Sequence, residues 1–559
     1  MERDKRVKYL LLIIGLTFTI YANTLKNDFV SDDLPAIVTN PNISCISCVS
    51  DLVNLSYHLN YLIGKLDPFI YHLTNIILHL LNSILVFFFL SLFFKATPSF
   101  WGSLIFVSHP IHTEAVTWIA GRPYLIFTCL LLFSFLSYVR ATSYNNSKSK
   151  LSDGSGCFSR PIILNERKRV KDLDRSFVPF ATLRGLRMSS RKDKESSPTA
   201  QLSINYFLIS LLMYFLSLYS GIFALIFPGM LILYDFTFGR WRKNYKLWFA
   251  FFALTLLKLL LISGGIKQRV IQVGLDTGQP GMSNPILNMA FSVFTHLSLL
   301  IWPQKLTLYH EPNIISAAAL GFEIFLLVLL FLLLPWIFKK TRKIFFAICF
   351  FILFLLPTYS PVAISWLVAE RYLYFPSLAL SMLAAFWIDR YAKEGKLKKW
   401  VSILLISLIV LYSWRTVVRN SDWKTHASIW KATVEVSPKS PKAHNNMGDV
   451  YSLEGNLEKA AEEFSRAIEL KPDYADAYHN LASVYQKMGR IDEAIMNYKK
   501  AVSINPFLYQ SYQNLGVIYL NKHQVDLAKE YFSKVLEIAP DNASVRQILR
   551  ESENINDNK

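Results

Sequence analysis

The sequence predicts an all-α protein in two parts, a polytopic helical membrane core of about eleven spans followed by an α-solenoid. Three observations predict this fold class: long apolar runs up to about residue 415, basic stretches between those runs, and a 34-residue repeat near the C-terminus. Of the 559 residues, 52% are hydrophobic and only 18% are charged, whereas soluble domains average roughly 25% charged residues. This composition excludes an ordinary soluble enzyme for most of the chain.

The apolar runs are long enough, or nearly long enough, to cross a bilayer. A hydrocarbon core about 30 Å thick requires roughly 20 helical residues. The run at 285–302 contains His296 and ends at Trp302 and Pro303, so we expect it to be interfacial or re-entrant. The eleven expected spans lie near 8–22, 70–94, 99–109, 123–139, 203–219, 221–237, 247–263, 313–337, 343–359, 372–388 and 400–414.

Basic segments predict how these spans are oriented. The chain has 59 Lys and Arg against 40 Asp and Glu, a net charge of +19, and loops rich in Lys and Arg stay in the cytoplasm. We therefore expect an uncleaved first span, a disordered cytoplasmic insert at 141–200, and a C-terminal domain on the extracytoplasmic or lumenal side. The segments expected in the cytoplasm are 1–8, 141–200, 240–243, 339–343 and 393–399, and those expected opposite are 23–57, 110–122, 264–312 and 360–371.

The C-terminal part repeats every 34 residues. Proline, asparagine, small and aromatic residues recur at this spacing, and that combination is the tetratricopeptide signature, in which small residues stand where paired helices cross. We predict a membrane domain at 1–415, a connector with a half repeat at 416–440, three repeats at 441–542 and a polar tail at 543–559. The recurring positions are Pro438/Pro472/Pro506/Pro540, Asn446/Asn480/Asn514, Gly448/Ala482/Gly516, Ala460/Ala494/Ala528 and Phe464/Tyr498/Phe532.

The recurring asparagines suggest a peptide-binding groove. Asn446, Asn480 and Asn514 occupy one repeat position on the first helix of each unit, and solenoids bind extended chains on the surface that these helices form. Each amide offers both a donor and an acceptor to a peptide backbone. The pattern resembles the asparagine ladder of O-GlcNAc transferase. The alternative is that these residues serve helix packing alone.

Three polar segments are expected on the extracytoplasmic side next to the membrane. The first contains Asp32 and Asp33, and the second runs from His109 through His112 and Glu114 to Arg122; the third begins with Glu370 and Arg371. Carboxylates at a membrane surface are unfavourable unless they bind or react with something. Arg can hold a phosphate bidentately and a carboxylate can take a proton from a hydroxyl, so this set of residues suits a lipid-phosphate substrate.

These segments resemble those of a known family. Asn27–Asp33, His109–Arg122, Glu370–Pro376, Arg419–Trp423 and the repeats are similar to the transmembrane and tetratricopeptide repeat-containing O-mannosyltransferases and their bacterial relatives, members of the GT-C superfamily. The resemblance implies an eleven-span GT-C core that moves a sugar from a polyprenyl phosphate to Ser or Thr of a protein. In the animal members of the family this sugar is mannose. The resemblance also implies that Asp32 or Asp33 is the catalytic base and that Glu114 is the second acid.

Further roles are hypotheses from the chemistry of the side chains. Arg122 and Arg371 would hold the donor phosphate, His109 or His112 would lie near the developing charge, and Glu370 would bind substrate. The lipid-linked sugar is a co-substrate, and we expect no cofactor, no metal and no nucleic-acid partner.

An alternative reading is a catalytically inactive, membrane-anchored repeat scaffold, because the chain reads Asp51–Ser56 and Tyr219–Gly221 where relatives carry an Arg and a Lys-Glu pair. The short repeat array favours a prokaryotic plasma membrane over the endoplasmic reticulum. Cys45 and Cys48 suit a local disulfide.

Overall fold

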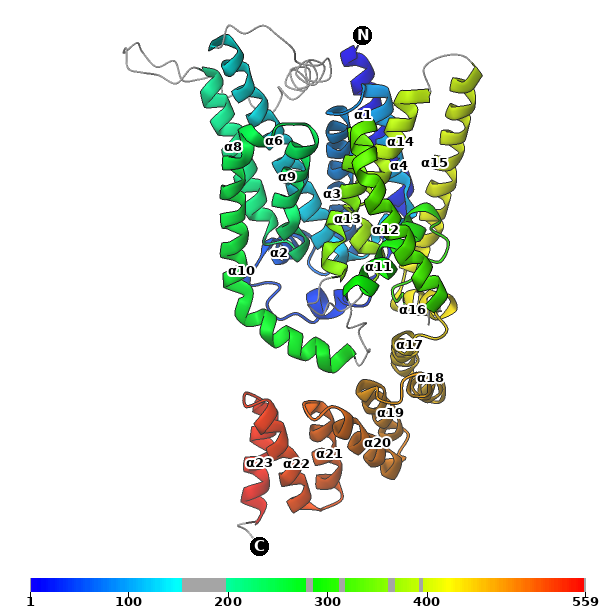
Figure 1. The fold of residues 1–559 in the computed structure, drawn as a ribbon. Coiled ribbons are helices and arrows are strands. Elements are labelled where there is room, and N and C mark those ends of the chain that lie inside the picture. The colour runs from blue at the N-terminus through cyan, green and yellow to red at the C-terminus, as the bar shows by residue number, and fades with distance from the viewer. Residues whose placement is uncertain are drawn as a thin grey trace, which may run out of the picture. The chain divides into compact units, whose positions relative to one another are not determined.

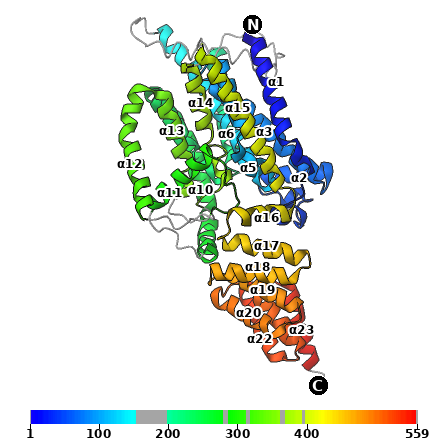
Figure 2. The ribbon, with the colours of Figure 1, turned by 90° about the vertical axis from the view of Figure 1, so that its right-hand side faces the viewer.

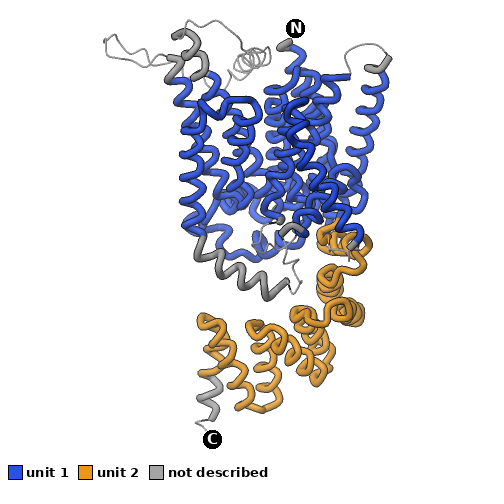
Figure 3. The backbone as a smooth tube through the Cα atoms, in the orientation of Figure 1, with its two compact units in different colours: residues 1–267, 284–306, 314–425 blue, residues 268–283, 307–313, 426–559 orange. Residues whose placement is uncertain are grey.

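The structure, a computed structural model, describes residues 2–152, 198–277, 285–310, 317–359, 367–391 and 396–556. Every regular element in these ranges is a helix, which confirms the predicted all-α class. The chain forms two compact units, coloured separately in Figure 3. Unit 1 comprises residues 1–267, 284–306 and 314–425, and unit 2 comprises 268–283, 307–313 and 426–559.

Unit 1 is a bundle of apolar helices that run roughly side by side (Figure 1). Each of the eleven expected apolar runs falls largely within one of these helices. The helices are α1 (Glu2–Tyr21), α3 (Pro68–Ser91), α4 (Ala96–Ser108), α6 (Arg122–Ser152), α8 (Pro198–Ser217), α9 (Phe227–Thr237), α10 (Trp241–Thr277), α11 (Pro285–Ile301), α12 (Ala317–Lys340), α13 (Arg342–Phe354), α14 (Leu378–Tyr391) and α15 (Lys396–Asp422).

Fewer helices than eleven meet the length and apolarity needed to cross a membrane. Within the described residues six do so: Asp4–Lys26, Pro68–Ser91, Ile119–Ser143, Trp241–Ile262, Ala318–Lys340 and Lys399–Asp422. Helices α4 and α13 have 13 residues each, which at 1.5 Å per residue gives about 20 Å, short of a 30 Å core. Gly102 lets α4 approach α14 closely, because an added β-carbon would come within 2.7 Å of the Ser381 carbonyl oxygen of α14.

The expected insert at 141–200 and the expected boundary at 415 differ from the structure. Helices α6 and α8 extend into both edges of the insert, and the rest of it, 153–197, lies outside the described residues. Helix α15 continues to Asp422, and the two units divide after Thr425. The polar residues at the end of this helix resembled a linker in the sequence, but Arg419 and Asn420 are buried inside unit 1.

Short helices form the loops at one end of unit 1. Asp51 caps α2 by accepting a hydrogen bond from the Asn54 backbone N–H at 2.8 Å, and Asp67 caps α3 in the same way through Phe69. Such caps satisfy backbone donors that the first helical turn leaves free. These elements are η1 (Ala22–Lys26), η2 (Leu34–Val38), η3 (Ile46–Cys48), α2 (Leu52–Gly64), η4 (Pro110–His112), α5 (Thr113–Thr117), η5 (Ile119–Gly121), η7 (Ile222–Ile226), η8 (Leu356–Tyr359) and η9 (Glu370–Leu373).

Unit 2 contains the predicted repeats, whose helices follow one another in chain order (Figure 2). The small residues lie where predicted: a β-carbon added at Gly448 would come within 2.7 Å of the Phe464 ring, and Gly516 is equivalent beside Phe532. The helices are α16 (His426–Val436), α17 (Pro441–Leu453), α18 (Leu457–Leu470), α19 (Ala475–Lys487), α20 (Ile491–Ile504), α21 (Tyr509–Asn521), α22 (Val525–Ile538) and α23 (Ala543–Asn556).

Two features of unit 2 differ from the expectation. The predicted polar tail forms helix α23, and its Val545 is fully buried against the last repeat. This helix caps the array, because a terminal repeat must cover the apolar face of its neighbour. Residues 307–310, which follow α11 in the chain, also belong to this unit: Tyr309 stacks on Trp430 with ring centroids 5.5 Å apart.

Candidate functional site

The polar segments singled out in the sequence converge at one end of unit 1. The Asp28 backbone N–H donates to the Lys424 carbonyl at 2.9 Å, which joins the first loop to the end of α15. Thr117 donates to the Asn420 side chain at 2.9 Å and joins the second segment to the same helix. Segments separated by hundreds of residues therefore share one polar cluster.

Asp33 fastens the first loop to the second. It is fully buried, and its carboxylate accepts hydrogen bonds from the backbone N–H of Ala120 at 2.7 Å and of Val30 at 3.0 Å. Burial raises the pKa of Asp33 to about 7, although these two N–H donors favour the charged form. Asp33 therefore positions the loop backbone.

Asp32 differs from its neighbour in remaining exposed. Partial removal of water by the surrounding chain raises the pKa of Asp32 above its ordinary value, and the positive charge of Arg371 opposes that shift. Of the two adjacent acids, Asp32 is the one that a solvent-borne group can reach.

Glu114 holds Arg371 in place. The Glu114 carboxylate is buried and accepts a hydrogen bond from the Arg371 backbone N–H at 2.6 Å as well as an ion pair from its guanidinium. The Arg371 side chain is 12% exposed and lies 5.5 Å from the Trp118 ring centroid and 5.2 Å from that of Tyr372. The guanidinium is thus fixed by a carboxylate and two aromatic rings while keeping some access to solvent.

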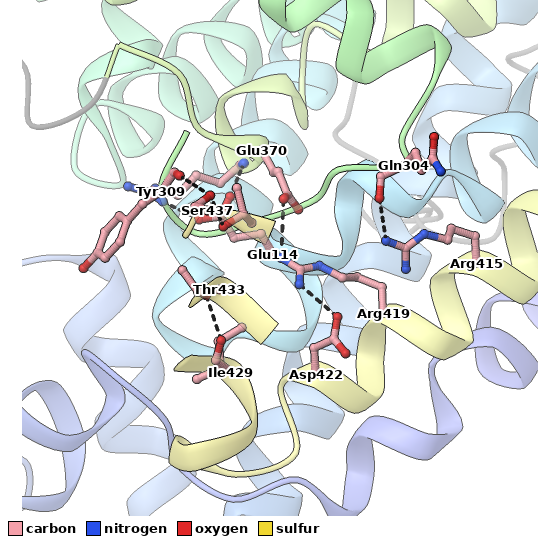
Figure 4. A network of polar contacts seen from close by, with 12 residues as sticks. Glu114, Gln304, Tyr309, Glu370, Arg415, Arg419, Asp422, Ile429, Thr433 and Ser437 are labelled. Atoms are coloured by element: carbon pink, nitrogen blue, oxygen red, sulfur yellow. Dashed lines mark hydrogen bonds and ion pairs between the residues drawn. The ribbon is translucent and has the colours of Figure 1, made fainter. Parts of the chain in front are cut away.

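The neighbouring Glu370 pairs with Arg419 instead. A guanidinium nitrogen of Arg419 lies 3.4 Å from the Glu370 carboxylate, and another donates to Asp422 at 2.9 Å (Figure 4). Glu370 and Arg419 are both essentially buried, so the ion pair ties η9 to the last turn of α15. Arg419 and Asp422 lie in a segment that the family resemblance alone had marked, and no spacing in the sequence pointed to the pairing of Arg419 with Glu370.

Arg122 is the centre of a buried hydrogen-bond cluster. Its guanidinium donates to Asn75 at 2.8 Å, to Ser56 at 3.0 Å, to Asn60 at 2.6 Å and to the Tyr71 carbonyl at 2.9 Å. The side chain is fully buried. In this arrangement Arg122 joins α2, α3 and α6, and a phosphate would have to displace protein acceptors to reach it.

The two histidines of the second segment are also buried. His109 donates from Nε2 to the Leu300 carbonyl at 2.8 Å and accepts at Nδ1 from the Ile111 backbone N–H at 3.1 Å. His112 hydrogen-bonds the Ser377 hydroxyl at 2.8 Å through Nε2. The structure thus buries both rings among the helices of unit 1.

The three groove asparagines all have protein partners for their amide nitrogens. Asn446 donates to the Tyr309 hydroxyl at 3.2 Å, Asn480 to the Asn445 side chain at 3.1 Å and Asn514 to the Tyr498 hydroxyl at 2.9 Å. Tyr309 belongs to the 307–310 segment, so this segment already binds the first of the three asparagines, Asn446.

Two further predictions concern cysteines and metals. Cys45 and Cys48 form a disulfide, as predicted. Among the residues that the structure describes, no group of three or more His, Cys, Asp or Glu side chains could hold a metal ion.

Known proteins resemble the chain in both units. Tetratricopeptide repeat models match residues 448–489, 475–508 and 509–542. Human "Protein O-mannosyl-transferase TMTC3" is 26% identical over 82% of this chain and 51% of its own length. The predicted resemblance is confirmed. The chain is a relative of the transmembrane and tetratricopeptide repeat-containing O-mannosyltransferases.

Other proteins with the same kind of name match a similar share of the chain. "Protein O-mannosyl-transferase F38B6.6" of Caenorhabditis elegans is 25% identical over 82% of this chain and 62% of its own. The chain therefore spans about half to three fifths of these relatives' length. A crystal structure of MamA is 30% identical over 26% of this chain and 76% of its own, with a TM-score of 0.20.

Proposed function

We propose that the protein is a membrane glycosyltransferase that moves a sugar, mannose in the first instance, from a polyprenyl phosphate to a Ser or Thr hydroxyl of a protein acceptor. The observation that carries this proposal is the contrast between two adjacent acids. Asp33 is buried and bound to backbone N–H groups, whereas Asp32 is exposed beside the charge of Arg371. An exposed carboxylate next to a fixed guanidinium suits a reaction in which a hydroxyl loses a proton while a phosphate departs.

Asp32 is the general base in this proposal. It takes the proton of the acceptor hydroxyl, whose oxygen forms a bond to the anomeric carbon as the bond from that carbon to the phosphate oxygen breaks. The configuration at the anomeric carbon is inverted. A raised pKa suits this role, because a base is most effective when its pKa lies closer to the working pH.

Arg371 holds the departing phosphate, and Glu114 positions Arg371. A guanidinium forms two parallel hydrogen bonds to a phosphate, and Arg371 keeps part of its surface in solvent while Glu114 fixes its direction. Arg122, His109 and His112 support the scaffold, since all three are buried and hydrogen-bonded to the protein groups described above. Glu370 likewise acts through Arg419 as a positioning residue.

The repeat domain presents the acceptor on the extracytoplasmic or lumenal side. The side-chain oxygens of Asn480 and Asn514 can accept hydrogen bonds from the backbone of an extended chain. Because the Asn446 amide is already bonded to the Tyr309 hydroxyl, the bound part of the acceptor chain begins at Asn480.

The test is sugar transfer by the purified protein in lipid nanodiscs. The donors are radiolabelled polyprenyl-phosphate mannose and a panel of other polyprenyl-phosphate sugars, and the acceptor is a mixed pool of Ser and Thr peptides. The proposal predicts transfer by the wild type and none by Asp32→Asn. Absence of transfer from every donor, together with peptide binding that depends on Asn480 and Asn514, would establish the scaffold instead.

A further inference from the structure

A small polar pocket lies in the first loop of unit 1, beside the proposed base. Its volume is about 210 Å³, and it lies between η2, the disulfide-closed turn at η3 and the start of α2. The polar residues that line it are Asn40, Asn42, Ser50, Asn54, Tyr57 and His58. None of the proposed reaction steps uses these residues.

The chemistry of the lining indicates a neutral ligand with many hydroxyl groups. The described residues that line the pocket include no Lys, Arg, Asp or Glu. The lining therefore offers no cation to a phosphate and no anion to an amine. Its amide and hydroxyl oxygens can accept hydrogen bonds from the hydroxyl groups of a sugar ring, whereas donors of Asn40, Asn54 and Tyr57 are used within the protein. Drug-sized ligands occupy roughly 300–1,000 Å³, and 210 Å³ is therefore a space for one sugar ring.

Internal bonds fix the directions of the lining groups. The Asn54 amide nitrogen donates to Ser50 at 3.0 Å and to Asp51 at 2.9 Å. His58 donates from Nδ1 to the Ile43 carbonyl at 2.8 Å. Cys48, which also lines the pocket, is joined to Cys45. A wall held in this way loses little conformational entropy when it binds a ligand, and this raises affinity.

The pocket is also connected to the proposed reaction centre. Ala36, part of its wall, donates its backbone N–H to the Asp32 carbonyl at 3.1 Å. On another side, the ring of Tyr57, which also lines the pocket, has its centroid 4.7 Å from the guanidinium carbon of the scaffold residue Arg122. One turn of the backbone therefore separates the base from this wall.

We infer that this pocket is a subsite for one neutral pyranose, next to the reaction centre. The inference rests on the proposed transfer for its biological meaning, but binding of a free sugar can be measured without any transfer. The pyranose is either the sugar of the donor or a sugar that the acceptor already carries.

The test uses the full chain in nanodiscs, produced in a host that lacks N-glycosylation, because Asn42 and Asn54 begin Asn-X-Ser sequences. Saturation-transfer NMR measures binding of methyl α-mannopyranoside. We expect wild type to bind, and Asn42→Leu and Ala36→Leu, which each reduce the pocket, to bind at least tenfold more weakly. The control Ser47→Leu lies exposed in the same loop outside the pocket and should bind like wild type.

Kinetics then distinguish the two sources of the sugar. A raised KM for the lipid-linked donor in Asn42→Leu identifies the donor sugar, and a raised KM only for a mannosylated peptide identifies an acceptor sugar. Sugar binding without any transfer supports the subsite while contradicting the proposed function. No binding by wild type, or equal binding by wild type, Asn42→Leu and Ala36→Leu, overturns the inference.

Discussion

Ionisation of Asp33 should loosen the contact between the first and second loops as the pH rises. The carboxylate is buried and its pKa is raised from 3.8 to about 7. Between these two pKa values the folded loop binds more protons than the opened loop, so the free energy of opening falls as pH rises and levels off about one unit above pH 7. At about 1.36 kcal/mol per pH unit, the rise from about pH 5 to about pH 8 removes about 2.6 kcal/mol, or close to a hundredfold in opening equilibrium.

Hydrogen–deuterium exchange of peptides covering 28–34 and 118–122 measures this opening in nanodiscs. Protection, corrected for the intrinsic pH dependence of exchange, should fall about a hundredfold in wild type between pH 5 and pH 8. In Asp33→Asn the fall should be much smaller, because the ionisable group is gone. Asp32→Asn is the matched control and should retain most of the wild-type dependence, because burial contributes more than the Asp32 charge to the raised pKa of Asp33. Equal pH dependence in wild type and Asp33→Asn would refute the reasoning.

Three further changes test other contacts. Arg122→Gln should destabilise unit 1 by about 3 kcal/mol or more, because buried acceptors lose a charged donor; thermal unfolding in detergent measures this, and an unchanged midpoint with a raised donor KM would instead indicate a phosphate ligand. Gly448→Leu should open the first repeat to limited proteolysis, because the new side chain meets the Phe464 ring, and resistance equal to that of the exposed control Leu453→Ala would contradict this close contact. Tyr309→Ala should increase binding of peptides from the Ser/Thr pool, because it removes the hydroxyl that the Asn446 amide bonds. Weaker binding would show that Tyr309 shapes the groove.

The sequence predicted the repeats well because their packing is local. A period of 34 residues fixes which helices meet, and small residues such as Gly448 mark the crossing points directly. The capping helix α23 was missed because only Val545 and a few other apolar residues stand among polar ones, and burial of that residue depends on the preceding repeat.

The sequence predicted which segments form the site, but it could not show which side chains in them are buried and bound to the protein. Charge bias between spans was enough to expect Asp32, Glu114 and Arg371 on one side of the membrane. Which of two adjacent acids is buried depends on the position of the Ala120 N–H, 87 residues away in the chain. Likewise, the acceptors around Arg122 come from two other helices, and no local pattern in the sequence reveals such a cluster.

The most direct measurement compares transfer rates of Asp32→Asn and wild type in the same nanodisc preparation, with exchange protection of the 118–122 peptide as the check on folding. A general base contributes roughly 10²- to 10⁴-fold in rate. We expect a loss of this size in Asp32→Asn with protection unchanged. Transfer by Asp32→Asn at the wild-type rate, with the loops equally protected, would contradict the assignment of Asp32 as the base.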